Sequence, residues 1–489
     1  MKSRAIRAGM VGGALLAAIA LGAPALAQAL PDVPPPSRYQ VDENGVDVAR
    51  GTMTGTRTDL AIGAAGRAGL AFLRRFGFGQ GGHNYDFGLF LSAGQTQAGI
   101  GLESIPFTQS GSTYTVADGS GATLVKSGST YTLTLSDGTI VVYNYTTLDH
   151  LDVQRFARAT SITYPSGETA TLTWVSLTWC SNSLDYCEGG TWLTGVRLQA
   201  VSSSMGYQLH FNYGRADVLV PMHGAHWRRL DGVTAINTTV ESCDPSAHSC
   251  SLTNTWPTVT YSGNDVTDPV GRTSTYTQGT LSYTIRRPSA GTPNVAYTIA
   301  SAYGRYPVTQ VVRDTLTWGY NYSVTGNVAT MIVTLPGSPA RTRTIVSDLN
   351  VGLPTSVTNE VGQTTVYAYD ASGRLTRATA PEDNYVELAY DARGNVTTRT
   401  AVPKPSTGLP NIVASAAYPA SCTNPATCNQ PTSTTDARGA VTDYTYNSTH
   451  GGVLTVTAPA PTTGAVRPQT RLTYSALTQP GGGSVYRLT

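Results

Sequence analysis

The chain has little charge and almost no lysine. Of its 489 residues, 13% are Asp, Glu, Lys or Arg, about half of the roughly 25% that is usual in soluble globular proteins. Lys2, Lys126 and Lys404 are its only lysines. Exposed helix faces normally carry Glu, Lys and Arg, so this scarcity argues against a helical protein. The net charge of +2 together with 40% hydrophobic residues also excludes a highly charged disordered chain.

The sequence also lacks a basic stripe and, beyond its N-terminus, a long apolar run. The arginines are scattered singly apart from three doublets, at 74–75, 228–229 and 286–287. A phosphate backbone needs a continuous basic surface, so we expect no nucleic-acid partner. No apolar run outside the N-terminus approaches the roughly 18 residues of a membrane-spanning helix. We therefore expect no transmembrane segment once the N-terminus is removed.

Strand and turn residues make up much of the remaining composition. The chain has 27 Tyr, 51 Gly and 28 Pro, and Thr, Ser and Val recur throughout. Such residues favour strands and tight turns, and no helical apolar period persists for three turns. The sequence therefore predicts an all-β protein. It indicates no enzyme, and we expect no catalytic residue, no cofactor and no resident metal.

The N-terminus resembles an export signal. Lys2, Arg4 and Arg7 precede an uncharged stretch from Ala8 to Leu26, and a small residue, Ala27, follows. This pattern predicts a signal peptide over residues 1–27 with cleavage after Ala27. A membrane anchor is the alternative, but the small-residue site and the following proline-rich run favour cleavage. The expected location is therefore secreted, periplasmic or at the cell surface.

Six cysteines form three local pairs, which suits an oxidising compartment. A metal site would require Cys-x2-Cys spacing or gathered histidines, and the nearby His223 and His226 lack an evident third ligand. We therefore predict structural disulfides between nearest neighbours, which are Cys180–Cys187, Cys243–Cys250 and Cys422–Cys428.

Alternating sequence interrupted by turn residues predicts several hairpins. One spans 131–145 around Asp137-Gly138, a strong hairpin signal. A second spans 162–174, and a third spans 197–213. Regular strands are expected from about residue 110 onward, and Gln469–Leu477 is expected to form a further strand.

A repeat occupies the last third of the chain. Tyr367-Ala-Tyr369-Asp370-Ala-Ser-Gly373-Arg374-Leu recurs 21 residues later as Leu-Ala-Tyr390-Asp391-Ala-Arg-Gly394-Asn395-Val. A copy displaced by 77 residues contains Asp436, Gly439, Tyr444 and Tyr446. Asp favours the first position of a type I turn, and Gly three residues later closes a hairpin. Each unit therefore predicts one hairpin that must stack on its neighbours to be stable.

Two readings of the paired tyrosines remain open. In Tyr-x-Tyr both rings point to one face of a strand, where they can pack against cross-strand neighbours. The same rings could also bind sugars or peptides by stacking.

The motifs Tyr369-Asp370-x-x-Gly373-Arg374 and Tyr390-Asp391-x-x-Gly394-Asn395 resemble the YD repeats of the RHS (rearrangement hotspot) family. The resemblance implies stacked antiparallel hairpins that wind into a spiral β-sheet, here a partial shell. It also implies four regions: the signal peptide (1–27), a Gly/Pro-rich segment (28–104), degenerate hairpins (105–345) and YD repeats (346–489). The last region is expected to be incomplete at its C-terminal end.

Full-length members of the family often enclose a toxic C-terminal segment and release it by cleavage. Neither a toxin segment nor the C-terminal core of the family is recognisable here. Asp268-Pro269-Val270-Gly271 has the letters of the cleavage motif but stands alone upstream of the repeats, so we interpret it as a turn.

The sequence therefore favours an exported structural shell or scaffold. Its candidate partner is a toxin cargo supplied by a missing C-terminal part. The alternative is a surface adhesin that binds carbohydrate or a cell-surface protein, and an enzyme is the weakest reading.

Overall fold

The computed structural model describes residues 41–63, 69–92, 94–117, 120–165, 167–181, 187, 189–216, 227–478 and 484–489. The predicted signal peptide and its cleavage position at Ala27 lie outside these residues. The fold is all-β, as predicted, with one short 3-10 helix, η1 (Pro405–Thr407). Among the described residues, no helix is long and apolar enough to cross a membrane.

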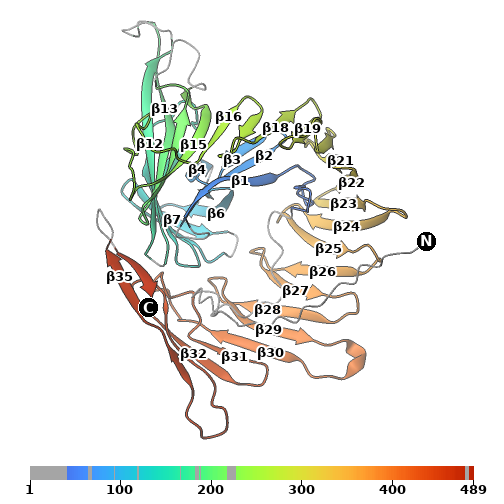
Figure 1. Ribbon diagram of the computed structural model, residues 1–489. Coiled ribbons are helices and arrows are strands. Elements are labelled where there is room, and N and C mark those ends of the chain that lie inside the picture. Colours follow the sequence, from blue (N-terminus) through green and yellow to red (C-terminus); the bar gives the residue numbers. More distant parts are fainter. Residues whose placement is uncertain are drawn as a thin grey trace, which may run out of the picture.

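Most of the strands belong to one long sheet of 31 strands, β4 to β34, in which neighbours in sequence are neighbours in space. The sheet curls, so that Figure 1 shows its strands arranged around a central space. Its first part contains β4 (Gly88–Ser92), β5 (Gln95–Ile100), β6 (Glu103–Ser110), β7 (Thr113–Val116), β8 (Thr123–Ser127), β9 (Thr130–Thr134), β10 (Ile140–Tyr145), β11 (Arg155–Thr163), β12 (Thr169–Cys180), β13 (Trp192–Ser203), β14 (Tyr207–Tyr213) and β15 (Leu230–Asn237).

The middle of the sheet contains β16 (Thr258–Ser262), β17 (Asp265–Thr267), β18 (Thr273–Gln278), β19 (Ser282–Arg286), β20 (Val295–Ile299), β21 (Val308–Arg313), β22 (Leu316–Thr325), β23 (Val328–Leu335) and β24 (Arg341–Asp348). The repeat region contains β25 (Leu353–Thr358), β26 (Thr364–Tyr369), β27 (Leu375–Thr379), β28 (Tyr385–Tyr390), β29 (Val396–Val402), β30 (Ile412–Ala417), β31 (Ser433–Thr435), β32 (Val441–Tyr446), β33 (Val453–Thr457) and β34 (Gln469–Arg471). Every ladder between these strands is antiparallel, because short turns connect them.

The three hairpins predicted from the sequence are confirmed by the strand pairings. β9 pairs with β10, β11 with β12, and β13 with β14. Tyr369 and Tyr390 are the last residues of β26 and β28, so each lies just before the turn of its own hairpin.

The long sheet is open. β11 pairs with β4 as well as with β10 and β12. The first strand of the sheet is therefore brought back against its eighth, which is a local feature of the N-terminal part of the sheet. Among the described strands, β34 pairs with β33 and with no strand of the first part. The architecture is therefore a curved wall with two ends.

The glycine-rich segment before residue 105 contains more regular structure than its weak patterning suggests. β1 (Gly55–Ile62), β2 (Leu70–Gly77) and β3 (Gln80–His83) form a separate three-stranded sheet. In Figure 1 this sheet lies inside the curve of the long sheet. Leu60, Leu70 and Phe72 of this sheet belong to the same buried core as residues of the long sheet, a packing that local sequence does not reveal.

The strand expected over Gln469–Leu477 is divided in two. β34 ends at Arg471, and β35 (Tyr474–Thr478) leaves the long sheet to pair with β36 (Ser484–Leu488). The ring of Tyr474 lies 4.6 Å from that of His450, and its hydroxyl donates to the Val453 carbonyl at 3.1 Å. These contacts hold Tyr474 against the start of β33, although β35 itself pairs only with β36 among the described strands.

Candidate functional site: the inner face of the sheet

Among the described residues, five Asp or Asn turns with the same geometry connect strands of the long sheet. In each, the side-chain Oδ1 accepts hydrogen bonds from the backbone N–H groups two and four residues later, as Asp370 does from Ser372 and Arg374 at 2.9 and 3.0 Å. The first residues of these turns are Asp268, Asn359, Asp370, Asp391 and Asp436. The side-chain oxygen of each of these residues is therefore used in hydrogen bonds within its own turn. The turn at Asp268 joins β17 to β18.

The glycine three residues later has a left-handed backbone in every case. The φ angles are 77° at Gly373, 90° at Gly394 and 79° at Gly439. Residues with a Cβ rarely adopt this conformation, so the turn requires glycine.

Three tyrosines that end a strand, just before the turns at Asp370, Asp391 and Asn447, each donate a hydrogen bond to a carbonyl at or near the start of the preceding strand. The acceptor is always 15 residues earlier: Tyr369 donates to Pro354 at 2.6 Å, Tyr390 to Leu375 at 2.7 Å and Tyr446 to Pro431 at 2.7 Å. The strand register shifts at each of these tyrosines, so the regular backbone hydrogen bonding between the two strands is interrupted there. The hydroxyl thus satisfies a carbonyl at the start of the preceding strand.

Strand register places many of the tyrosines on one continuous face. Tyr322 is opposite Met331, Met331 opposite Ile345, and Ile345 opposite Val357. Val357 is opposite Thr365, which shares its side of β26 with Tyr367 and Tyr369. Directly opposed residues in antiparallel strands point to the same side, so this face runs from the middle of the sheet into the repeats.

The N-terminal segment packs against the middle of this face. The Tyr320 hydroxyl donates to Asp42 Oδ2 at 2.6 Å and accepts from Asn44 Nδ2 at 2.8 Å. The Tyr297 hydroxyl donates to the Asn44 carbonyl at 2.7 Å. Burial raises the pKa of Tyr297 to about 12, so this hydroxyl keeps its proton. The face that holds the N-terminal segment is therefore the inner face of the curve.

A buried polar cluster adds to this contact. The Asp59 carboxylate, with 1% of its side chain exposed, lies 2.6 Å from Arg74 and accepts from the Tyr261 hydroxyl at 2.9 Å. Phe72 packs edge-on against Phe211 at 5.6 Å between ring centroids. Burial and then the Asp59 charge raise the pKa of Tyr261, which keeps it a donor.

Over the repeats the inner face is less covered. Tyr367, Tyr369, Tyr390, Tyr444 and Tyr446 are half-buried, and Tyr444 stacks on Tyr446 at 6.5 Å between ring centroids. Half-exposed aromatic rings can bind apolar or sugar surfaces by stacking.

The six cysteines are paired as predicted. Cys180–Cys187, Cys243–Cys250 and Cys422–Cys428 have Cα separations of 5.3, 5.4 and 4.8 Å. All three close loops at strand ends. His223 and His226, the weak zinc alternative, lie outside the described residues.

His210 is not among the residues predicted from the sequence. It is buried next to the Cys243–Cys250 disulfide. Its Nδ1 lies 3.8 Å from Cys243 Sγ. The two residues are 33 positions apart, and no motif in the sequence links them.

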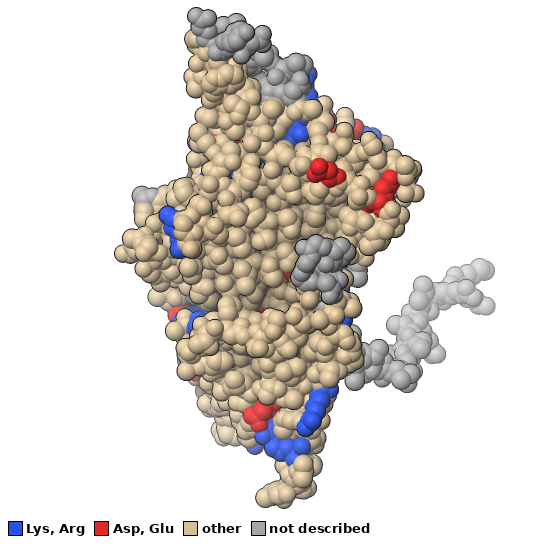
Figure 2. All heavy atoms as spheres, turned by 90° about the vertical axis from the view of Figure 1, so that its left-hand side faces the viewer, with Lys and Arg blue, Asp and Glu red and all other residues tan. Residues whose placement is uncertain are grey.

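Charged side chains are sparse on the face shown in Figure 2, and they are separated by uncharged surface. This face therefore carries no continuous basic stripe.

Comparisons with known proteins identify the repeat. Residues 351–385 match the family model described as RHS Repeat. No curated protein matches the chain. Solved structures that resemble it include a mutated Tc holotoxin pore of Photorhabdus luminescens, with 10% identity and a TM-score of 0.34 over 83% of this chain and 23% of that chain. Another is the TcdB2-TccC3-Cdc42 complex, with 11% identity and a TM-score of 0.31 over 86% of this chain and 22% of that one.

This chain spans less than a quarter of the length of those chains. The matched segment, 351–385, begins just before β25 and ends at the start of β28, and so contains the turn of Asp370 and Gly373. The chain therefore contains an RHS repeat at residues 351–385.

Proposed function

We propose that this protein is a structural wall of the RHS type, whose inner face holds polypeptide. The observation that carries the proposal is the continuous inner face that the strand register defines. Its middle part is occupied by the N-terminal segment of the same chain, through Asp42, Asn44 and Asp59. The face thus has the side chains needed to hold extended chain.

The repeat part of the inner face is the proposed site for cargo. Its tyrosines are half-buried rather than covered by the N-terminal segment. We infer that a further polypeptide, such as a toxin segment that extends or accompanies this chain, lies against β25 to β33. Aromatic rings whose hydroxyl groups are already hydrogen-bonded suit this role. They can pack against apolar surface and need no specific hydrogen-bonding group on the cargo.

Export belongs to the same proposal. Three disulfides support an oxidising compartment, and the N-terminal pattern supports a signal peptide over 1–27. The remaining divisions proposed are 28–104, 105–345 and 346–489.

The test uses protein purified from cells that express the native locus. We expect electron cryo-microscopy to find a second stretch of polypeptide against the inner face of β25–β33, and limited proteolysis to find that stretch protected. The double variant Tyr367→Ala/Tyr444→Ala should reduce this protection. Tyr303→Ala, at an exposed tyrosine outside the repeats, serves as the control.

A glycan array with the same protein distinguishes the adhesin alternative. Saturable glycan binding that the double variant abolishes, without any protected polypeptide, would replace the shell proposal.

A further inference from the structure

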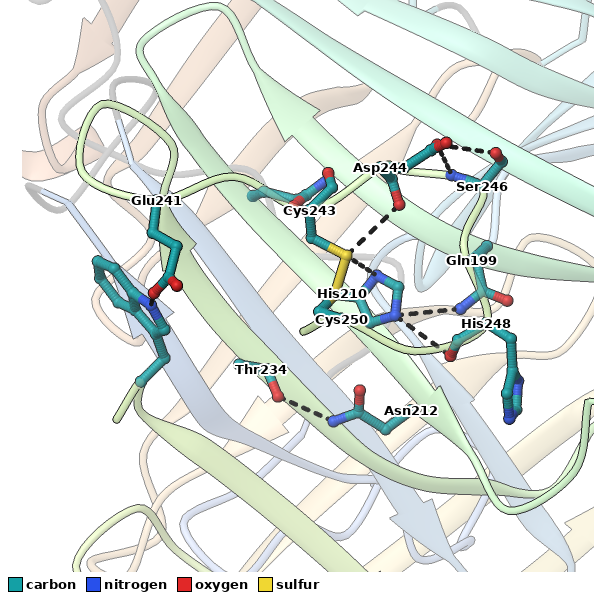
Figure 3. Close-up of a disulfide and its surroundings, with 12 residues drawn as sticks. Gln199, His210, Asn212, Thr234, Glu241, Cys243, Asp244, Ser246, His248 and Cys250 are labelled. Atoms are coloured by element: carbon teal, nitrogen blue, oxygen red, sulfur yellow. Dashed lines mark hydrogen bonds between the residues drawn. A yellow bond between two sulfur atoms is a disulfide. The ribbon is translucent and has the colours of Figure 1, made fainter. Parts of the chain in front are cut away.

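The second disulfide belongs to a cluster that differs from the other two. Among the described residues, His210, Cys243 and Cys250 form the group whose possible ligand atoms all lie within 4.8 Å of one another. Figure 3 shows the imidazole of His210 facing the sulfur atoms of this disulfide. The other two disulfides have no such histidine within the part of the chain that the structure describes.

The position of His210 in β14 directs its ring toward the disulfide. Leu209 and Phe211 flank it and point to the inner face, where Phe211 packs on Phe72. His210 therefore points to the outer face, where the loop between β15 and β16 covers it to 1% exposure. Its Nε2 lies 3.5 Å from the His248 carbonyl and 3.4 Å from Gln199 Nε2, and its Nδ1 faces Cys243 Sγ at 3.8 Å.

The loop is held in place independently of the disulfide. The Glu241 carboxylate accepts from Asn254 N at 3.1 Å and Trp256 Nε1 at 2.8 Å, and it also accepts from Thr253. These bonds join the loop on both sides of the cysteine pair. In addition, Gln208 Nε2 donates to the Cys243 carbonyl at 3.2 Å. Opening the S–S bond would therefore leave both cysteines close to His210.

Two thiolates and one neutral imidazole are the ligands that Zn²⁺ prefers, at about 2.3 Å for sulfur and about 2.0–2.1 Å for nitrogen. Three protein ligands leave one coordination position for water or another small ligand.

We propose that His210, Cys243 and Cys250 form a redox-controlled Zn²⁺ site, closed in the disulfide state and open to metal in the dithiol state. A dithiol reductant supplies two electrons and two protons to the S–S bond and itself becomes a disulfide. Zn²⁺ then displaces the two thiol protons and binds both sulfur atoms and His210 Nδ1.

The test compares oxidised protein with protein reduced by a phosphine under non-denaturing conditions. We expect the reduced protein to bind one equivalent of Zn²⁺ tightly and the oxidised protein to bind none. Co²⁺ substituted for Zn²⁺ should show sulfur-to-metal charge-transfer absorption. Zn²⁺ should also protect Cys243 and Cys250 from alkylation, read by mass spectrometry, while Cys180, Cys187, Cys422 and Cys428 remain reactive.

His210→Ala should weaken Zn²⁺ binding by about 100-fold, since even outer partners of a metal site contribute about 10- to 100-fold. The double variant Cys180→Ser/Cys187→Ser, which removes a disulfide without a histidine, should leave the affinity unchanged. Equal protection of all six cysteines, or unchanged affinity in His210→Ala, would overturn the proposal. Loss of strand circular dichroism on reduction would do so too, because the site requires the loop to keep its shape.

Discussion

At the residue scale, the tyrosine of each repeat acts through its hydroxyl as well as its ring. Tyr369, Tyr390 and Tyr446 each reach the carbonyl 15 residues earlier. Tyr213 does the same to Leu198 at 2.6 Å, well outside the recognisable repeats. The degenerate part of the sheet therefore uses the same hydrogen bond as the repeats.

Tyr390→Phe should destabilise its hairpin by about 1 kcal/mol, the net value of one such hydrogen bond. Native-state hydrogen exchange should show about fivefold faster opening of β27 and β28. Tyr385→Phe is the control, because no described residue is hydrogen-bonded to the Tyr385 hydroxyl. Equal effects of the two variants would show that the Tyr390 bond contributes nothing.

The glycines of the turns are required for their backbone angles. At Gly439, with φ at 79°, a Cβ would meet no atom within 4 Å. Gly439→Ala should therefore cost about 1–2 kcal/mol through backbone strain alone. Gly291, where a Cβ would also meet nothing but φ is not left-handed, is the matched control. Thermal melts and exchange in β31–β32 should change for Gly439→Ala and not for Gly291→Ala.

At the element scale, five hairpins of the long sheet are each organised by one carboxylate or amide at the turn. Asn359 accepts from Val361 N and Gln363 N at 3.1 and 2.9 Å, as Asp436 does from Arg438 N and Ala440 N at 2.8 and 2.9 Å. The turn thus needs an acceptor and not a charge. The charge adds a dependence on pH.

The backbone N–H groups of Ala440 and then Arg438 lower the pKa of Asp436 below its ordinary value of 3.8. A lowered pKa in the folded state stabilises the hairpin fully above about pH 4. This stabilisation is lost as pH falls through the folded-state pKa. Exchange protection in β31–β32, corrected for intrinsic rates, should therefore fall below pH 4 in the parent protein.

Asp436→Asn should keep the turn and remove this acid sensitivity, as at Asn359. An Asn variant that loses protection below pH 4 as steeply as the parent would assign the effect to other groups.

At the scale of the whole molecule, the C-terminal hairpin β35–β36 contacts turns in the first part of the long sheet. Arg487 in β36 lies 3.3 Å from Glu168, in the turn between β11 and β12. Its Nη2 also lies 3.2 Å from Met205 Sδ, at the tip between β13 and β14. A Cβ on Gly167 would come within 2.7 Å of the Ser484 carbonyl, so the turn and the hairpin β35–β36 fit closely. Figure 1 shows β35 beside the first part of the sheet.

Arg487→Ala should loosen this contact by up to about 1 kcal/mol, because the guanidinium is partly exposed. Exchange should rise both in β35–β36 and in the distant turn around Glu168. Arg272→Ala, which removes the local ion pair with Asp268, should affect only its own turn. Faster exchange in β36 without any change near Glu168 would show that the hairpin β35–β36 and the turn around Glu168 open independently.

The sequence by itself determined the all-β class, the hairpin turns and the three disulfides. Each depends on residues close together in the chain: Asp370 with Gly373, or Cys243 with Cys250. Turn geometry and short loop closure act over a few residues, so they leave a pattern that sequence reading can detect.

Only the tertiary structure decided where the N-terminal segment lies, which face of the sheet is inner and what surrounds His210. Tyr320 and Asp42 are 278 residues apart, and Arg487 and Met205 are 282 apart. Neither pair follows a local period, because the curvature accumulated over many strands brings them together. A small error in the twist of each strand would place them far apart, so no local pattern encodes these contacts.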